Sequence, residues 1–349
     1  MSVQTTAPAR QASPPYRLVL PASADRALWL AERRKGIGSS DVAAVMGVSS
    51  YGSAQHVYYD KRGDLELESD AGEAALWGSL LEETVAREWA RRNRSVVRRV
   101  GLIARKDAIH QRCTLDRRVD ECPLNREQHE RCALEVKCRN AFVAKKWKKN
   151  IPDDVLAQVL WQLYVTGYDH IHVAVLIGGS DFRQYTIRRA DHTALIGDIV
   201  TVVDRLWRDI QLGRVPALTG EEPVDPMLDL FDELWPDRQG MKNLDEFPAL
   251  ALEAFANITD YETARLEESA ARKRKEAAKV AMTEALQDRA GAVLDGDLAY
   301  EYVPTEGREK TNTTLLAEKY PEAYAECVVR EPGKRLSIAK RYRMTELPS

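Results

Sequence analysis

The sequence predicts an α/β fold for residues 16–215, because strand-like and helix-like segments follow one another there. Residues 133–138 alternate apolar and polar side chains as a half-buried strand does. Residues 172–177 are almost continuously apolar, which is typical of a central strand. Between them, residues 153–163 carry an apolar stripe at helical spacing. This strand–helix–strand order forms the centre of the predicted fold.

Other elements extend this fold. A second helix is expected over residues 193–212, where Gly213 ends it, and an edge strand over residues 183–188. Residues 96–105 are strand-like. Residues 24–34 predict a short helix with Ser23 as its cap.

Domain boundaries follow from changes in composition. Residues 1–15 are mostly small and polar and are expected to be disordered, and residues 216–240, rich in proline and acidic residues, are expected to be a linker. Residues 241–349 are predicted to form an α+β appendix. It comprises a long charged helix (260–289), a strand pair turning at 295–297, a helix (314–320) and a basic strand (334–343).

Composition restricts the functional class only weakly. The chain has 349 residues, of which 30% are charged, and a net charge of −3, so any basic surface for nucleic acid must be local. No apolar run reaches membrane length and no hydrophobic signal core begins the chain, so we expect a cytoplasmic protein without a membrane partner. The five cysteines are an odd number, which fits a reducing compartment. Cys122, His129, Cys132 and Cys138 match no common zinc spacing, so the cysteines are interpreted as scattered buried or free thiols.

Two carboxylates and a lysine are the strongest chemical signal. Asp116 is expected on an earlier, adjacent strand, and Glu135 and Lys137 share one face of the strand over residues 133–138. Two carboxylates around one hard cation, with a lysine beside them, can cleave a phosphodiester. The alternative is an ordinary strand whose charged side chains face water.

A long helix supplies a third acidic candidate. The helix expected over residues 74–92 has an apolar stripe made of Trp77, Leu80, Leu81, Val85 and Trp89. Helical spacing places Glu83 on the opposite, wet face, but does not choose between Glu82 and Glu88.

Two further segments could contact a phosphate backbone. Ser39, Ser40 and Asp41 are expected to cap a small helix, with Arg33 just before it, which would suit a phosphate. An ordinary capped helix explains the same residues. Lys145 and Lys146 stand beside Trp147 in a helix expected over 140–149, and suit either a nucleic-acid backbone or a solvated face.

Taken in order, these residues resemble a known family. The resemblance rests on five signals between about residues 23 and 210: Trp29, Arg33, Ile37, Gly38, Ser40 and Asp41; Trp77, Gly78 and Glu82; Asp116; Leu134–Cys138; and Ala157–Val159. In this order they are similar to the YqaJ-type viral recombinases, which are lambda-exonuclease-like members of the PD-(D/E)xK nuclease superfamily. The resemblance implies a restriction-endonuclease-like core, with a mixed central sheet flanked by helices. The family proline before the aspartate is Leu115 here, and a tyrosine of the lambda type is replaced by Val155.

Roles for individual residues come from this resemblance alone. It implies that Asp116, Glu135 and the Val136 carbonyl bind metal, with Glu82 near them in preference to Glu88. It implies that Lys137 orients or deprotonates the attacking water and that Gln158 touches the site. Arg33 and Ser40 would hold the 5′-phosphate of a DNA end. Outside this resemblance, the positive charges of Lys145 and Lys146 beside Trp147 make them further candidate DNA contacts.

The activity implied is 5′–3′ exonuclease cleavage of linear double-stranded DNA with Mg²⁺ or Mn²⁺, two ions being expected. The 3′ strand left behind would pass to a recombination or single-strand-annealing protein, in the host cytoplasm if the protein is of phage origin. Trimers form in the lambda branch, and the sequence leaves the oligomeric state open. The alternatives are an endonuclease, a CRISPR-associated or RecB-like nuclease, or a non-catalytic DNA-binding scaffold.

Overall fold

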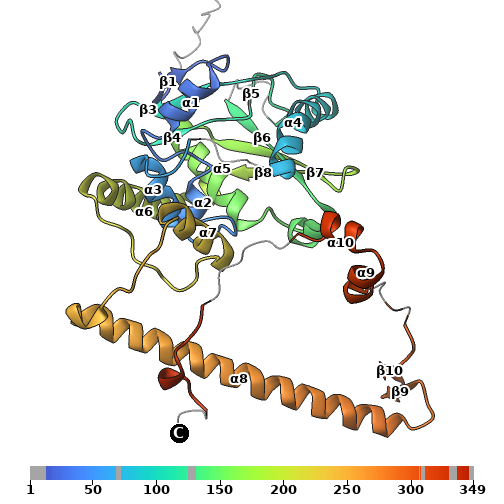
Figure 1. Cartoon of the computed structure of the whole chain (residues 1–349). Coiled ribbons are helices and arrows are strands. Elements are labelled where there is room, and N and C mark those ends of the chain that lie inside the picture. The colour runs from blue at the N-terminus through green and yellow to red at the C-terminus, as the bar shows by residue number, and fades with distance from the viewer. Residues whose placement is uncertain are drawn as a thin grey trace, which may run out of the picture. The chain divides into compact units, whose positions relative to one another are not determined.

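The computed structural model describes residues 13–67, 72–124, 131–305, 307, 311–329 and 336–345. The chain divides into two compact units, residues 1–238 and 239–349 (Figure 1). The disorder expected for residues 1–15 falls mostly outside the described residues.

The first unit is built around a mixed five-stranded sheet. Its strands, in spatial order, are β2 (Val97–Arg98), β5 (Arg117–Val119), β6 (Cys132–Arg139), β7 (His170–Ile177) and β8 (Asp181–Arg188). β6 and β7 run parallel, and every other neighbouring pair is antiparallel. β6 is thus paired along both edges, whereas β8 lies at the end of the sheet.

Helix α5 (Asp153–Thr166) makes the crossover that two parallel strands require. Pro152 precedes its acidic first turn, and Gly167 ends it at φ +69°, a left-handed conformation that glycine adopts without strain. The buried Val159, Leu160 and Leu163 face the sheet as the apolar stripe predicts.

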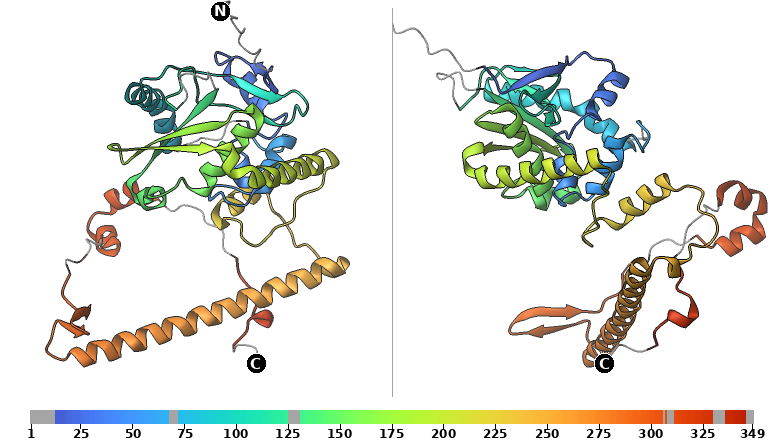
Figure 2. Two further views of the ribbon diagram at one scale, coloured as in Figure 1. Left: turned by 180° about the vertical axis from the view of Figure 1, so that it is seen from behind. Right: turned by 90° about the vertical axis from the view of Figure 1, so that its left-hand side faces the viewer.

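Helices cover both faces of the sheet (Figure 2). α5 and α6 (Thr193–Leu212) form one core with Ile171, Val173 and Val175 of β7. α4 (Gly72–Asn93) forms a second core with Leu134 and Val136 of β6. This arrangement confirms the fold class expected from the sequence.

The strand expected over residues 96–105 is wrong as one element, because it divides between two sheets. β2 joins the central sheet, and β3 (Leu102–Arg105) joins a small antiparallel sheet with β1 (Tyr16–Leu20) and β4 (Arg112–Cys113). Gly101 lies between them, where a Cβ would stand 1.8 Å from the carbonyl oxygen of Leu20. Only glycine allows this close approach of two backbones, which separates the two strands.

Three details of the helices also differ from expectation. α1 (Arg26–Arg33) is capped by Asp25, not Ser23, since the Asp25 carboxylate accepts from the N–H groups of Ala27 and Leu28. In α4 the expected buried stripe fails at its beginning: Trp77 and Leu80 are exposed, because the core on this face reaches only Val85, Ala86 and Trp89. Residues 141–147 form a 3-10 helix (Ala141–Trp147) rather than a longer helix.

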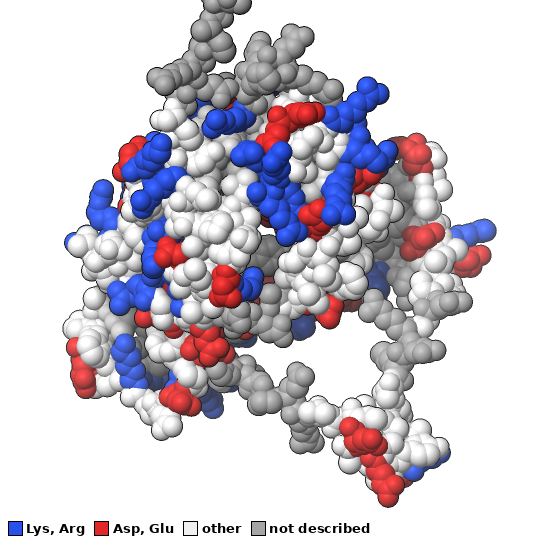
Figure 3. Space-filling view, turned by 90° about the horizontal axis from the view of Figure 1, so that it is seen from above, with Lys and Arg blue, Asp and Glu red and all other residues white. Residues whose placement is uncertain are grey.

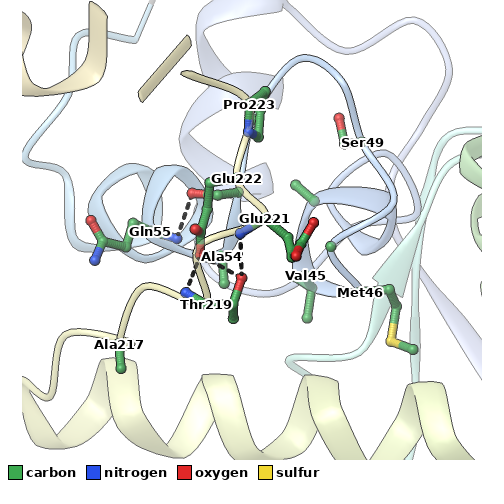
Figure 4. A pocket seen from close by; sticks show the side chains of 14 residues that line it. Val45, Met46, Ser49, Ala54, Gln55, Ala217, Thr219, Glu221, Glu222 and Pro223 are labelled. Atoms are coloured by element: carbon green, nitrogen blue, oxygen red, sulfur yellow. Dashed lines mark hydrogen bonds between the residues drawn. The ribbon is translucent and has the colours of Figure 1, made fainter. Parts of the chain in front are cut away.

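The segment expected as a linker folds onto the first unit. It contains α7 (Val224–Leu234), whose Met227 and Leu230 are buried. The Gln55 amide of α3 (Ala54–Arg62) donates 2.8 Å to the Pro216 carbonyl. Figure 4 shows the pocket between these segments, a cavity of 160 Å³ in which Glu222 accepts from the backbone and hydroxyl of Thr219. The Glu222 carboxylate therefore stabilises the turn over residues 219–222.

The second unit contains the long helix α8 (Pro248–Leu286), which begins twelve residues before its expected start. After it come β9 (Gly291–Leu294) paired with β10 (Asp297–Glu301), α9 (Thr313–Lys319) and α10 (Pro321–Cys327). The expected basic strand is wrong for residues 336–343, which form no strand but a 3-10 turn at Lys340–Tyr342. No helix of the described residues is both long and apolar enough to cross a bilayer.

Candidate active site

Adjacent strands bring Asp116 and Glu135 together. β5 and β6 pair antiparallel with Arg117 opposite Leu134, so the register continues with Asp116 opposite Glu135. Residues directly opposite in an antiparallel pair share a face of the sheet. The Val136 backbone N–H also donates 2.7 Å to Asp116 Oδ2, which holds this carboxylate against β6.

Glu135 is the centre of a hydrogen-bond network. Its side chain is only 2% exposed, and both oxygens accept from α5. Gln158 Nε2 donates 2.6 Å to Oε1, and Gln162 Nε2 donates 2.7 Å to Oε2. Lys137 closes the ring, with Nζ 2.5 Å from Glu135 Oε1 and 2.9 Å from Gln158 Oε1. A buried carboxylate held by three donors keeps a single orientation.

Charge accumulates in this site. The pKa of Asp116 is raised well above its ordinary value, first by burial and then by the negative charge of Glu135; Lys137 partly offsets this, and Glu82 adds to it. Hard oxygen donors gathered under like-charge repulsion are the set that Mg²⁺ or Mn²⁺ prefers, and a bound cation would relieve the repulsion. The residues present thus fit a divalent ion held by Asp116 and Glu135.

Arg117 connects helix α4 to the site. Its guanidinium is 3% exposed and donates to Glu82 Oε1 at 2.5 Å and to Glu83 Oε2 at 2.7 Å. The same side chain donates to the Asp116 carbonyl. The prediction that Glu83 lies on a wet face is therefore wrong in part, because Glu83 shares Arg117 with Glu82.

Arg33 and Ser40 do meet. Arg33 Nη2 donates 3.0 Å to Ser40 Oγ and 2.8 Å to Asp41 Oδ1. Ser40 is not a helix cap, since α2 (Val42–Val45) is a single turn that begins after Asp41. The buried Lys61 ammonium lies 2.7 Å from Asp41 Oδ2, so Asp41 joins both cations.

This cluster lies beside the carboxylates. Ser39, next to Ser40, donates to the Thr114 carbonyl at 3.5 Å, and Gln162 donates to the same carbonyl at 3.0 Å. Two residues later in the chain stands Asp116. The segment over residues 114–116 therefore contacts both Ser39, the neighbour of Ser40, and Gln162, which binds Glu135.

With this geometry in view, comparison with known proteins identifies the region. Residues 28–169 match the family described as YqaJ-like viral recombinase domain. This match defines residues 28–169 as a YqaJ-like domain. Over 204 residues the chain is 35% identical to the uncharacterized protein YqaJ of Bacillus subtilis (strain 168), a match that covers 57% of this chain and 61% of that relative. The chain thus matches less than two thirds of the length of that relative.

Solved structures give a weaker similarity. The chain is similar to the alkaline exonuclease LHK-Exo from Laribacter hongkongensis and to the complex of LHK-Exo with dAMP. Both matches have 21% identity and a TM-score of 0.45, and cover 54% of this chain and 93% of the other.

All candidate residues lie within the YqaJ-like domain. Lys145 and Lys146 are exposed on the 3-10 helix around the buried Trp147. Figure 3 shows Lys and Arg side chains gathered on the face seen from above, with acidic side chains between them. On this face, acidic side chains therefore interrupt the basic ones.

Sequence reasoning missed two residues of the YqaJ-like domain. Gln162 lies one helical turn after Gln158 and binds the other oxygen of Glu135, a relation that their spacing on α5 already suggested. Arg117 follows Asp116 directly, but its contacts with α4 span 34 and 35 residues and have no local signature.

Proposed function

We propose that the first unit is a metal-dependent deoxyribonuclease that degrades linear duplex DNA from a 5′ end. The observation that carries this proposal is that Asp116, directly before β5, lies beside Glu135 and Lys137 of β6, and that Arg117 holds Glu82 near them. Membership of residues 28–169 in a viral recombinase family supports a role in DNA recombination. Degradation of one strand from a DNA end would expose the complementary single strand that strand annealing requires.

Divalent ions bound at Asp116 and Glu135 would polarise the scissile phosphate and stabilise the attacking and leaving oxygens. The protein's own groups would do the positioning. Gln158 and Gln162 fix the two oxygens of Glu135, and the backbone N–H of Val136 fixes Asp116. The Lys137 side chain, already within hydrogen-bond distance of Glu135, would orient a water next to the phosphate, and in its neutral amine form it would accept the proton of that water.

Arg33 and Ser40 would bind the terminal 5′-phosphate. Both contacts of Arg33 use Nη2, and a guanidinium has further N–H donors on Nε and Nη1 that a phosphate can accept from. Anchoring the end beside Thr114 would place the next phosphodiester near Asp116. Lys145 and Lys146 are suited to contact the backbone further along. The 3′ single strand produced would be the substrate of an annealing or recombination protein.

The test compares three DNA substrates in Mg²⁺: linear duplex with a 5′-phosphate, linear duplex with a 5′-hydroxyl, and closed circular duplex. We expect the phosphorylated end to be degraded fastest and the closed circle to stay intact. Cleavage of the closed circle would instead support an endonuclease, and binding without any cleavage a DNA-binding scaffold. Glu135→Gln provides the inactive control.

Three single variants test whether Arg33 and Ser40 bind the terminal 5′-phosphate. Ser40→Ala removes one hydrogen bond, worth about 1 kcal/mol, and should reduce the preference for the phosphorylated end about fivefold. Arg33→Ala should abolish the preference, although it also takes a partner from Asp41. Lys35→Ala is the matched control, because it removes a positive charge from the same segment at an exposed side chain. An equal effect of Lys35→Ala would mean that only net charge matters.

A further inference from the structure

Four metal-binding side chains gather on the sheet face opposite Glu135. They are Cys122, Cys132, His170 and His172, and their ligand atoms all lie within 4.8 Å of one another. Cys132 is three positions before Glu135 on β6, so the two side chains point to opposite faces. The cysteines belong to the core that contains Trp89 of α4, whereas Val173 of β7 belongs to the core on the other face. The cluster is thus separate from the candidate active site.

Sheet register explains why these residues meet. His170 and His172 are two apart on β7 and share a face. In the parallel pairing, Ala133 is opposite Ile171, and the residues just before them are Cys132 and His170. Cys122 follows β5 and returns to the same place, with Sγ 3.0 Å from His170 Nε2 and 3.4 Å from His172 Nε2.

Burying these thiol and imidazole groups in an apolar core costs free energy unless each of them has a strong bonding partner. The exposed fractions are 2% for Cys122, 0% for Cys132, 1% for His170 and 4% for His172. Val85, Trp89 and Leu134 form the apolar core around them. Polar groups buried in such a core must be satisfied, and a thiol is a weak donor with a single proton. The Cys122 thiol cannot donate to both imidazoles.

One histidine is already oriented as a metal ligand is. His172 Nδ1 lies 3.0 Å from the Thr186 hydroxyl on β8, which leaves Nε2 directed at Cys122. A hydrogen bond at the second ring nitrogen is the usual way in which proteins fix a histidine ligand.

The distances suit one tetrahedral ion. With Zn–S of about 2.3 Å and Zn–N of about 2.0–2.1 Å, a tetrahedral site separates sulfur and nitrogen by about 3.5 Å. The observed separations of 3.0 and 3.4 Å need only small movements to reach this value. A two-iron cluster with the same residue types would bind cysteines and histidines to different irons. Here cysteine and histidine atoms lie in direct contact, so they would share an ion.

We propose that Cys122, Cys132, His170 and His172 bind one structural Zn²⁺ ion, which ties the β5–β6 connection and β6 to β7. All four positions are protein ligands and the cluster is buried, which is typical of a closed structural site. Such a site would brace the strand that carries Glu135 from behind. This proposal is independent of the nuclease proposal, because its readouts are metal content and stability.

The first experiment uses the full-length wild-type chain, purified from zinc-supplemented medium and dialysed. Elemental analysis should find one zinc per chain and no iron. Chain prepared with Co²⁺ instead should show the absorption of a tetrahedral, thiolate-bound ion. Stripping the zinc with a strong chelator should lower the unfolding temperature of the first unit.

Variants assign the ion to this site. Cys132→Ser and His172→Gln should each reduce the zinc content to below half, whereas Glu135→Gln should leave it unchanged. Cys138→Ser is the matched control, since it lies on the same strand but outside the cluster. Folded wild-type chain that contains no zinc, and whose Cys122 and Cys132 are free thiols or a disulfide, would overturn the proposal even if a variant fails to fold. Zinc loss in Glu135→Gln would also overturn it, by placing the ion in the carboxylate site.

Discussion

Gln162 Nε2 lies 2.7 Å from Glu135 Oε2 and 3.0 Å from the Thr114 carbonyl, so one amide nitrogen joins α5, β6 and the segment that leads to Asp116. In the proposed nuclease Gln162 would be a positioning residue, because it would act on the reaction only through Glu135. Its substitution by Ala should lower kcat about 10- to 100-fold and raise the Mg²⁺ concentration needed for half-maximal activity. Gln211→Ala, at an exposed position near the end of α6, is the control. An unchanged Mg²⁺ dependence would show that Gln162 only supports the fold.

The two carboxylates that face each other across β5 and β6 should be indispensable. Asp116→Ala or Glu135→Ala would remove a proposed metal ligand and should lower cleavage by several orders of magnitude, while DNA binding persists. Gel-shift binding and single-turnover cleavage on the same linear duplex measure the two effects separately. Asp120→Ala is the control, because Asp120 follows β5 but pairs with Arg98 and Arg118. Near-normal turnover by either site variant would refute the assignment.

Glu82 and Glu83 can be separated although both bind Arg117. Glu82 adds to the charge felt by Asp116, so Glu82→Gln should reduce cleavage more than Glu83→Gln does. Arg117→Met should destabilise the first unit by about 1–3 kcal/mol, since it removes hydrogen bonds to two carboxylates. Denaturant unfolding measures the stability of Arg117→Met, and cleavage rates on linear duplex DNA compare Glu82→Gln with Glu83→Gln. Equal cleavage by the two Glu variants would mean that Arg117, and not Glu82 itself, matters to the site.

The Asp41 cluster predicts a particular acid dependence. Burial alone raises the pKa of Asp41, but Lys61 and Arg33 outweigh it and lower the pKa to about 2. In the unfolded chain an aspartate has a pKa of about 3.9. A depressed pKa stabilises the folded state above that value, and this contribution is lost as the pH falls from about 4 toward 2.

Asp41→Asn should therefore flatten the dependence of stability on pH in that window. It should also destabilise the protein at pH 7 by about 3–5 kcal/mol, because the buried Lys61 loses a partner. Thermal unfolding followed by circular dichroism between pH 2 and pH 7 measures both effects. Asp64→Asn, which removes an exposed pair with Arg62, should behave like the wild type. If the two variants give the same pH profile, Asp41 is not the titrating group.

The sequence predicted most of what is local. Alternation on β6, the proline and acids that begin α5, and the glycine that ends α6 each act within a few residues, and the structure agrees with all three. Which side chains are buried depends on tertiary contacts, which a local pattern does not contain. Trp77 satisfies the helical period of α4 and is nevertheless exposed, because periodicity cannot show where the underlying core ends.

The same limit applies to the functional clusters. Cys122 contacts histidines that lie 48 and 50 residues later in the chain. Because common zinc motifs are recognised by short spacings between ligands, this set has no recognisable zinc pattern in the sequence. Of the four thiols and imidazoles considered from the sequence, Cys138 lies outside the cluster and His129 outside the described residues. The pairing of β6 with β7 brings His170 and His172 to Cys132, and no local pattern encodes that register.

The terminal position of β8 in the sheet bears on how the protein behaves at high concentration. A strand of eight residues with one open edge offers backbone groups that a second chain could pair with, which is a common route to aggregation. β8 carries Asp181, Arg183 and Arg188 along its length. Pairing this edge with a strand of another chain would strip water from these charged side chains. The charged residues of β8 therefore protect the native sheet from growing by strand addition.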